Sequence, residues 1–298
     1  MEQALVTRGL NKNYGDLAAL VDLDLTVEAG VVFGFLGPNG AGKTTAIRVF
    51  MDEIRSSSGS ASILGHDVHR DSVALHRKVG YLPSDLALYP NMTGTDLLHF
   101  FANLRGGVDS QYVNALSERL DAQMSKKIGD LSSGNRQKIG IIQAFMSKPE
   151  FVILDEPSAG LDPLIQRELQ ALMRETADAG GTVFLSSHTL SEVQRVADRV
   201  GIIRNGKLIA QESIASLRAK GIRKIEIELA SEPDPIIFTG IPGIRSLLIE
   251  HNRVFIAYEG AMQNLLSVVM GSCELIDVST NEADLEEVFL TYYHDEAS

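Results

Sequence analysis

The chain has 298 residues, of which 44% are hydrophobic, and its formal net charge is −12. This length favours one large and one small domain, and the hydrophobic fraction excludes wholesale disorder. Proteins that bind nucleic acid usually present a basic surface to the phosphates, so the negative charge predicts that no nucleic acid is a partner.

No apolar run approaches the roughly 20 residues that a membrane-spanning helix requires. The first ten residues lack the basic and apolar regions of a signal peptide, and the single cysteine, Cys273, cannot form an internal disulfide. We therefore expect a soluble, cytoplasmic chain. If it serves a membrane, another polypeptide must cross the bilayer.

Apolar and polar residues alternate from Val21 to Val27, which predicts one strand of an antiparallel sheet with a solvated face. Three short runs without alternation, at 31–36 (VVFGFL), 151–154 (FVIL) and 182–185 (TVFL), are typical of strands covered on both faces in a parallel sheet. Helical stretches follow each run, so the core is predicted to be an α/β sandwich. The Asn-Gly pair at 205–206 predicts a hairpin turn.

Residues from about 84 to 130 are predicted to be mostly helical, with a helix start at Thr93 and an acidic residue, Asp96, in its first turn. After about Lys220, apolar residues alternate again at 225–229, and an amphipathic segment occupies 283–293. We expect a first domain over residues 1–218 and a small α+β domain over 219–298.

A glycine-rich segment follows the first buried strand and precedes a predicted helix, in the pattern G-x-x-x-x-G-K-[ST]. It comprises Gly37, Pro38, Asn39, Gly40, Ala41, Gly42, Lys43, Thr44 and Thr45. The glycines let backbone N–H groups converge on an anion, and the helix N-terminus adds its dipole. Lys43 is predicted to reach the β- and γ-phosphates of a nucleotide, and the Thr44 hydroxyl to join the shell of a Mg²⁺ ion.

Two carboxylates, Asp155 and Glu156, stand at the end of a predicted buried strand, where ligands bind in open α/β sheets. Asp155 is suited to hold Mg²⁺, and Glu156 is suited to act as the general base that activates water. His188 follows the next buried strand, and a histidine there can donate a hydrogen bond to a γ-phosphate.

Together these residues resemble the nucleotide-binding subunits of ABC transporters over about the first 218 positions. The discriminating element is Leu131-Ser132-Ser133-Gly134-Asn135, which resembles the signature motif of that family. Residues 158–162, ending in Asp162, resemble its D-loop, His188 its switch histidine, and Tyr14 the aromatic residue that stacks on adenine. The implied fold is α/β: a P-loop NTPase core with an antiparallel β subdomain and a helical subdomain, plus a small C-terminal α+β domain.

The resemblance also implies ATP and Mg²⁺ as cofactors and a homodimer that sandwiches ATP between one phosphate loop and the partner's signature motif. Three positions depart from the family pattern. Ser133 replaces a glycine, and if that position needs a positive φ the cost is about 1–2 kcal/mol. Asn135 replaces the usual glutamine. Ser84 replaces a glutamine or glutamate; as a candidate metal ligand it can reach water near Mg²⁺, but its side chain is too short to do what a glutamine does.

The C-terminal domain resembles the accessory domain of bacterial drug- and antibiotic-export ATPases, whose partner is a separate integral-membrane permease. We therefore expect ATP hydrolysis that drives export, with the chain peripheral on the inner face of the membrane. Two alternatives stay open: a soluble ABC ATPase that acts on ribosomes or DNA, and a regulatory cassette with weak hydrolysis. The sequence does not specify the transported substrate.

Overall fold

The computed structural model describes residues 2–220 and 223–281. The chain divides into two compact units, with the division after Gln211. The boundary expected after residue 218 falls inside helix α8 (Ile214–Lys220), within the second unit.

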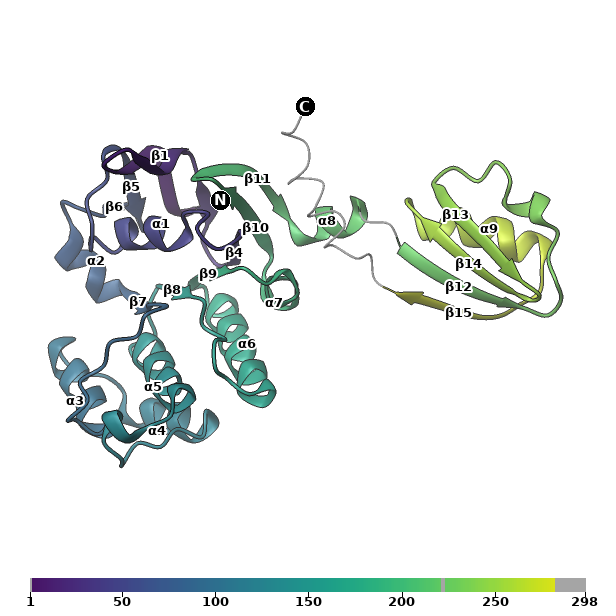
Figure 1. The fold of residues 1–298 in the computed structure, drawn as a ribbon. Coiled ribbons are helices and arrows are strands. Elements are labelled where there is room, and N and C mark those ends of the chain that lie inside the picture. The colour runs from purple at the N-terminus through teal and green to yellow at the C-terminus, as the bar shows by residue number, and fades with distance from the viewer. Residues whose placement is uncertain (1, 221–222, 282–298) are drawn as a thin grey trace. The chain divides into compact units, whose positions relative to one another are not determined.

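The first unit is built on a six-stranded sheet (Figure 1). Its strands, in spatial order, are β11 (Lys207–Ser213), β10 (Arg199–Arg204), β4 (Val32–Leu36), β9 (Thr182–Ser187), β8 (Phe151–Asp155) and β7 (Val79–Leu82). The strands from β10 to β7 are parallel, and every residue of β4, β8 and β9 is buried. The three predicted buried strands are therefore confirmed, as is the hairpin turn at 205–206 between β10 and β11.

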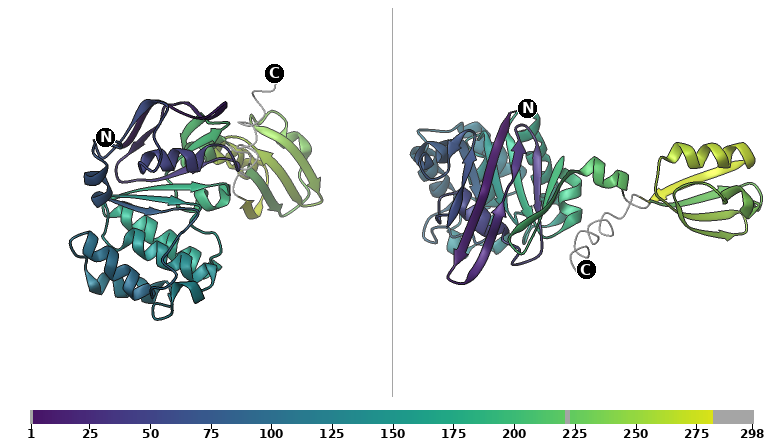
Figure 2. Two further views of the ribbon diagram at one scale, coloured as in Figure 1. Left: turned by 60° about the vertical axis from the view of Figure 1, so that its left-hand side comes forward. Right: turned by 90° about the horizontal axis from the view of Figure 1, so that it is seen from above.

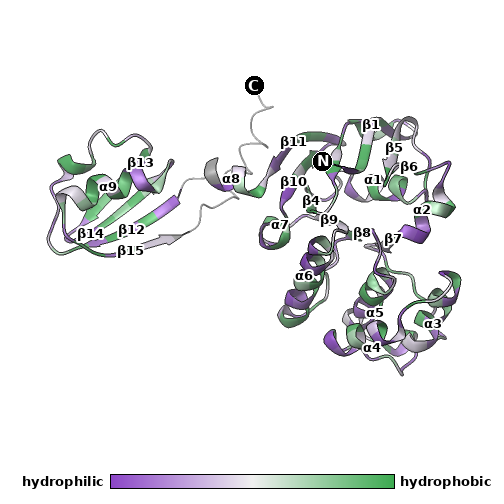
Figure 3. Ribbon diagram, turned by 180° about the vertical axis from the view of Figure 1, so that it is seen from behind, coloured by the Kyte–Doolittle hydropathy of each residue, from purple (hydrophilic) through white to green (hydrophobic). Residues whose placement is uncertain are grey.

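Four helices pack against this sheet: α1 (Lys43–Phe50), α5 (Ser133–Phe145), α6 (Pro163–Asp178) and α7 (Leu190–Val196). Helix α6 has hydrophobic and hydrophilic segments in Figure 3, and its buried residues recur at helical spacing from Ile165 to Ala177. The Phe184 ring on β9 contacts the rings of Phe33, Phe35 and Phe50, so aromatic packing fixes α1 on the sheet.

A second, antiparallel sheet covers the opposite side of α1. It contains β1 (Gln3–Tyr14), β2 (Leu17–Leu23), β3 (Thr26–Glu28), β5 (Ser58–Ile63) and β6 (His66–Asp67), and α2 (Ser72–Lys78) follows it. The antiparallel pairing and the alternating burial predicted from Val21 to Val27 are confirmed, but the strand is not continuous, because the chain breaks between β2 and β3. At the break the Thr7 hydroxyl donates to Leu23 O (2.6 Å) and accepts from Leu25 N (2.8 Å), while Thr7 N still donates to Leu25 O (2.8 Å), so a side chain supplements the backbone hydrogen bonds.

The helical region contains α3 (Gly94–Leu104), α4 (Ser110–Arg119) and the short 3₁₀ helix η1 (Ile128–Asp130), and α3 and α4 pack on α5. The predicted start at Thr93 is confirmed as a capping box, in which Thr93 and Asp96 satisfy each other's backbone N–H groups. In Figure 1 and in the left-hand view of Figure 2 these helices group together, apart from the antiparallel strands.

The second unit contains a four-stranded sheet in the order β13 (Ile244–Glu250), β14 (Arg253–Tyr258), β12 (Arg223–Leu229) and β15 (Leu275–Asn281), with η2 (Pro235–Phe238) and α9 (Met262–Ser272). The predicted alternation is confirmed, since Ile225, Ile227 and Leu229 are buried in a cluster with Leu265 and Val269 of α9. The amphipathic segment expected at 283–293 lies outside the described residues.

Candidate active site

The glycine-rich segment forms a tight turn between β4 and α1. Gly40 and Gly42 have φ angles of 79° and 109°, which side-chain-bearing residues rarely adopt. A Cβ atom on Gly42 would lie 2.7 Å from the carbonyl oxygen of Ala19, so only glycine fits here. The turn therefore presents the first N–H groups of α1, which have no partner within the helix, to one point.

Lys43, the first residue of α1, is 6% exposed. Its Nζ donates to Gly37 O (2.7 Å) and Pro38 O (3.2 Å), and it lies 3.3 Å from Glu156 Oε1. The two carbonyls and the carboxylate hold the ammonium group in place over the turn.

A buried carboxylate lies beside the next residue. Thr44 Oγ1 donates to Asp155 Oδ2 (2.9 Å), and the Ser186 hydroxyl donates to Asp155 Oδ1. Asp155 is fully buried at the end of β8. Hydroxyl and carboxylate oxygens together are a donor set that Mg²⁺ prefers.

Glu156, directly after β8, has a φ angle of 51°. Its Oε2 lies 2.7 Å from Nδ1 of His188, which follows β9, and its N–H donates to Ser186 O (3.1 Å). The carboxylate thus lies between the Lys43 ammonium and an imidazole that is 55% exposed.

These groups border a cavity of about 690 Å³ at the carboxyl ends of the parallel strands. Of the predicted site residues, its lining includes Tyr14, Asn39, Gly40, Ala41, Gly42, Lys43, Thr44, Thr45, Ser84, Glu156 and His188. Further lining residues were not predicted as site residues: Leu17, Ala18, Ala19, Ala159, Asn205 and Gly206. Gly206 N donates to Ala41 O (2.9 Å), so the predicted Asn-Gly turn closes over the phosphate loop.

Tyr14 ends β1 and is 44% exposed. Its ring has Lys12 Nζ at 5.1 Å from the ring centre. A partly exposed aromatic ring at the wall of this cavity is suited to stacking on a planar base.

The signature residues are not among those that line this cavity. Ser132 caps α5 and accepts from Asn135 N (3.3 Å), and Ser133 is the first helical residue. The condition for strain at Ser133, a positive φ, is not met, because the residue has helical geometry. Gly134 is the constrained position instead, since a Cβ there would lie 2.7 Å from Gly160 O.

Two other predicted residues make local contacts. Asn135 Oδ1 accepts from Gln123 N (3.2 Å). Asp162 caps α6, where its Oδ1 accepts from the N–H groups of Leu164 (3.0 Å) and Ile165 (3.1 Å). The Asp162 side chain therefore stabilises the start of α6, whereas Asn135 bonds the first turn of α5 to the chain after α4.

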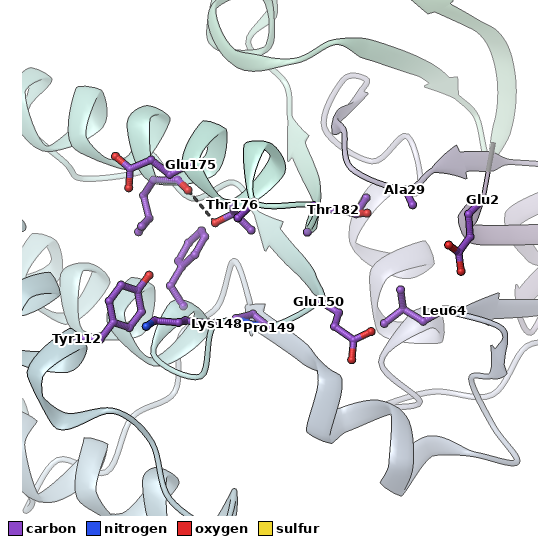
Figure 4. A pocket seen from close by; sticks show the side chains of 15 residues that line it. Glu2, Ala29, Leu64, Tyr112, Lys148, Pro149, Glu150, Glu175, Thr176 and Thr182 are labelled. Atoms are coloured by element: carbon purple, nitrogen blue, oxygen red, sulfur yellow. Dashed lines mark hydrogen bonds between the residues drawn. The ribbon is translucent and has the colours of Figure 1, made fainter.

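A second cavity, of about 550 Å³, lies at the amino ends of the same strands (Figure 4). Glu150 stands directly before β8 and Thr182 opens β9. Lys148 lies over the Tyr112 ring at 4.6 Å, and burial, followed by the negative charge of Glu175, raises the pKa of the Tyr112 phenol. The glycines that line this cavity, Gly180 and Gly181, follow the C-terminal end of α6, unlike the phosphate-loop glycines of the first cavity, which precede the N-terminus of α1.

Comparison with known proteins identifies the family. The family profile described as ABC transporter matches residues 20–159. The bacitracin transport ATP-binding protein BcrA of Enterococcus faecalis is 34% identical over 233 residues, which cover 77% of this chain and 76% of that protein. The daunorubicin resistance ATP-binding protein DrrA3 of Streptomyces coeruleorubidus is 32% identical over 301 residues, covering 97% and 95%.

Solved structures agree with this assignment. The ATP-binding subunit of an ABC transporter is 29% identical, with a TM-score of 0.68 over 72% of this chain and 92% of that one. A dimeric ATP-binding cassette in a post-hydrolysis state, bound to ADP and phosphate, shares the fold at 18% identity, with a TM-score of 0.65 over 70% and 98%. The chain therefore belongs to the ABC transporter family, as one of its ATP-binding and ATP-hydrolysing subunits.

Proposed function

We propose that this subunit hydrolyses ATP between two copies of itself and thereby drives export of a substrate through a separate membrane permease. The observation that carries the proposal is the contact of Glu156 with both Lys43 Nζ (3.3 Å) and His188 Nδ1 (2.7 Å) at the mouth of the 690 Å³ cavity. A carboxylate, an ammonium group and an imidazole thus converge on one point, which supports the roles proposed below.

In this proposal each group has one role in hydrolysis. Lys43 and the N–H groups of the turn bind the β- and γ-phosphates, and the Tyr14 ring stacks on the adenine. Glu156 accepts a proton from the attacking water, and His188 holds the Glu156 carboxylate in line and donates to the γ-phosphate. Lys43 Nζ, which has three donors, exchanges its present acceptors for phosphate oxygens.

The oxygen atoms of Thr44 and Asp155 fit a bound Mg²⁺, because both are hard ligands and already lie 2.9 Å apart. When bound, the ion neutralises charge on the β- and γ-phosphates. Ser186 fixes the second oxygen of Asp155 and so limits its rotation. Ser84 lines the cavity and reaches this shell only through water, given its short side chain.

The position of the signature residues supports the dimer. Ser132, Ser133, Gly134 and Asn135 open α5 but border no part of the chain's own nucleotide cavity. A helix N-terminus binds anions through free N–H groups and its dipole, so this one is available to a nucleotide held by a second copy. Asp162, at the start of α6, belongs to the same surface in this proposal.

A groove next to Ser84 is suited to bind part of the permease. It has a volume of about 270 Å³ and is lined by apolar and aromatic residues, among them Pro83, Leu86 and Tyr89. Gln143 Oε1 is buried there without a hydrogen-bond partner in the described part of the chain. Because Pro83 and Leu86 flank Ser84, one short segment borders both the groove and the nucleotide cavity, which couples the two sites.

The described residues contain no helix with the length and hydrophobicity that a bilayer crossing requires. In this proposal a separate permease supplies the pathway, and the subunit binds it at the inner face of the membrane. Relatives named for bacitracin transport and daunorubicin resistance favour export of a drug-like substrate over an action on ribosomes or DNA. The intact Lys43, Glu156 and His188 contacts favour hydrolysis over a purely regulatory role.

Light scattering on the Glu156→Gln variant tests the proposal. We expect a monomer without nucleotide and a dimer with Mg²⁺ and ATP, because the bound ATP is not consumed. Adding Gly134→Ala should abolish the dimer but keep ATP binding, since its Cβ would displace Gly160. Gly271→Ala, whose Cβ meets nothing within 4 Å, is the matched control and should still dimerise. A mass that is independent of ATP would overturn the proposal.

A further inference from the structure

The Glu192 carboxylate joins two loops that flank the catalytic pair. Glu192 lies in the first turn of α7. Its Oε1 accepts from the Ser158 hydroxyl, and its Oε2 accepts from the Ser187 hydroxyl (2.6 Å). Each carboxylate oxygen is therefore bonded to a serine from a different part of the chain.

The two serines are close in sequence to Glu156 and His188. Ser158 is two residues after Glu156, and Ser187 directly precedes His188. Ser187 Oγ also accepts from Thr189 N (2.9 Å), so the backbone on both sides of His188 is tied to the same group. The Glu192 carboxylate thus connects the chain after the base to the chain around the imidazole.

The loop that contains Ser158 also contacts the signature helix. Gln137 of α5, which is buried, donates through Nε2 to Pro157 O (2.9 Å). A Cβ atom on Gly134 would lie 2.7 Å from Gly160 O. This loop, residues 157–161, therefore lies against α5 at Pro157 and Gly160 and is bonded to Glu192 through Ser158.

We propose that Glu192 is a positioning residue for ATP hydrolysis: it holds the 157–161 loop against the end of β9, so that Glu156 Oε2 stays within 2.7 Å of His188 Nδ1. This inference depends on the proposed function, because it concerns the rate of that hydrolysis. A carboxylate suits the role because two hydroxyl donors require two acceptor oxygens, and a single side chain supplies both. Glu192 does not touch the nucleotide cavity, so its effect passes through Glu156 and His188.

The first experiment compares the ATPase kinetics of Glu192→Ala, Glu192→Gln and the wild type. We expect Glu192→Ala to lower kcat by about tenfold to a hundredfold, the scale of a small misplacement of catalytic groups, with KM for ATP unchanged. Glu192→Gln retains one acceptor oxygen and should recover part of the loss. Ser191→Ala, an exposed neighbour on the same helix, is the control and should match the wild type in both constants.

A second experiment separates positioning from helix stabilisation, because an acid in the first turn also stabilises α7. If Glu192 acts through Ser158, the double variant Glu192→Ala/Ser158→Ala should be no slower than Glu192→Ala alone. If the losses in kcat from Glu192→Ala and Ser158→Ala multiply in the double variant, the proposal is overturned. It is also overturned if Glu192→Ala raises KM with kcat unchanged, or if Glu192→Ala hydrolyses ATP at the wild-type rate. A wild-type protein without ATPase activity would instead contradict the proposed function itself.

Discussion

The main sheet of the first unit has a cavity at each edge, and the two differ in what faces them. The carboxyl edge has a cavity of about 690 Å³, and the amino edge one of about 550 Å³. Each is lined by a lysine, a glutamate next to β8, and a tyrosine: Lys43, Glu156 and Tyr14 at one edge, and Lys148, Glu150 and Tyr112 at the other. Volume and composition alone therefore do not identify the active site.

The arrangement of the charged groups distinguishes the active site from the other cavity. Lys43 is 6% exposed and is held by two carbonyls and Glu156, at the start of a helix. Lys148 is 61% exposed and contacts Asp109 (3.4 Å) and the Tyr112 ring. A buried cation with converging partners is pre-organised for a charged ligand, whereas an exposed one is screened by water. The comparison teaches that convergence at the carboxyl ends of the strands distinguishes the site.

The largest difference between the two cavities is expected when the lysine of each is replaced by alanine and ATP binding is measured. Lys43→Ala should abolish ATP binding, because it removes the main side-chain cation that faces the triphosphate. Lys148→Ala should leave ATP binding unchanged. Equilibrium binding of a fluorescent ATP analogue measures both. Wild-type affinity in Lys43→Ala would mean that the glycine-rich turn is not the phosphate site.

The glutamates provide the next contrast. Glu156→Gln keeps the shape of the side chain but loses the charge that accepts a proton, so turnover should fall at least about a hundredfold with ATP affinity nearly unchanged. Glu150, exposed and paired with Lys78 (3.4 Å) at the other end of β8, is the control. Glu150→Gln should hydrolyse ATP at the wild-type rate in a phosphate-release assay. If Glu156→Gln does so too, His188 is the next residue to test as the base.

The tyrosines should differ more modestly. Tyr14→Ala should weaken ATP binding by about 1–3 kcal/mol, the usual contribution of one stacked base, and Tyr14→Phe should restore it. Tyr112→Ala removes a half-buried ring at the amino edge and should lower the melting temperature without changing ATP affinity. Isothermal titration calorimetry measures the affinity of each variant for ATP, and for GTP as a second nucleotide with a planar base. Equal affinities of Tyr14→Ala and the wild type would exclude stacking.

The smallest effect is expected from shortening the chain. Every residue that lines the carboxyl-edge cavity lies at or before Gly206, so a chain that ends at Lys220 should bind ATP with unchanged affinity. We expect the truncation to reduce dimer stability or the coupling of hydrolysis to transport instead. A truncated chain with a wild-type circular dichroism spectrum but no ATP binding would show that the second unit contributes to the site.

The sequence alone was sufficient for the parallel strands and for the order of the motifs, because buried apolar runs and glycine-rich turns are local patterns. The break between β2 and β3 was not predictable, because the apolar alternation continues through it, and the hydroxyl that bonds to the backbone there belongs to Thr7, a residue distant in sequence. The Asn-Gly turn at 205–206 is a local pattern and was recognised. Its hydrogen bond to Ala41 joins distant segments and was not predicted.

Long-range contacts also explain the remaining differences. The crowding at Gly134 comes from Gly160, which is distant in sequence, and a motif reveals that a glycine is present but not which atom excludes a side chain. The hydrogen bond that Ser158 donates to Glu192 likewise joins segments 34 residues apart. Such contacts are set by tertiary packing, which periodicity does not report.

The backbone at Glu156 has a consequence for how this subunit can diverge. Its φ of 51° lies in the left-handed region, which is costly for branched side chains and easiest for glycine, asparagine and aspartate. Replacements of Glu156 that all abolish hydrolysis should therefore differ in how much they destabilise the fold. Descendants that lose hydrolysis while keeping a stable fold should carry glycine, asparagine or aspartate here far more often than valine, isoleucine or threonine, so the backbone angle filters which inactive lineages persist.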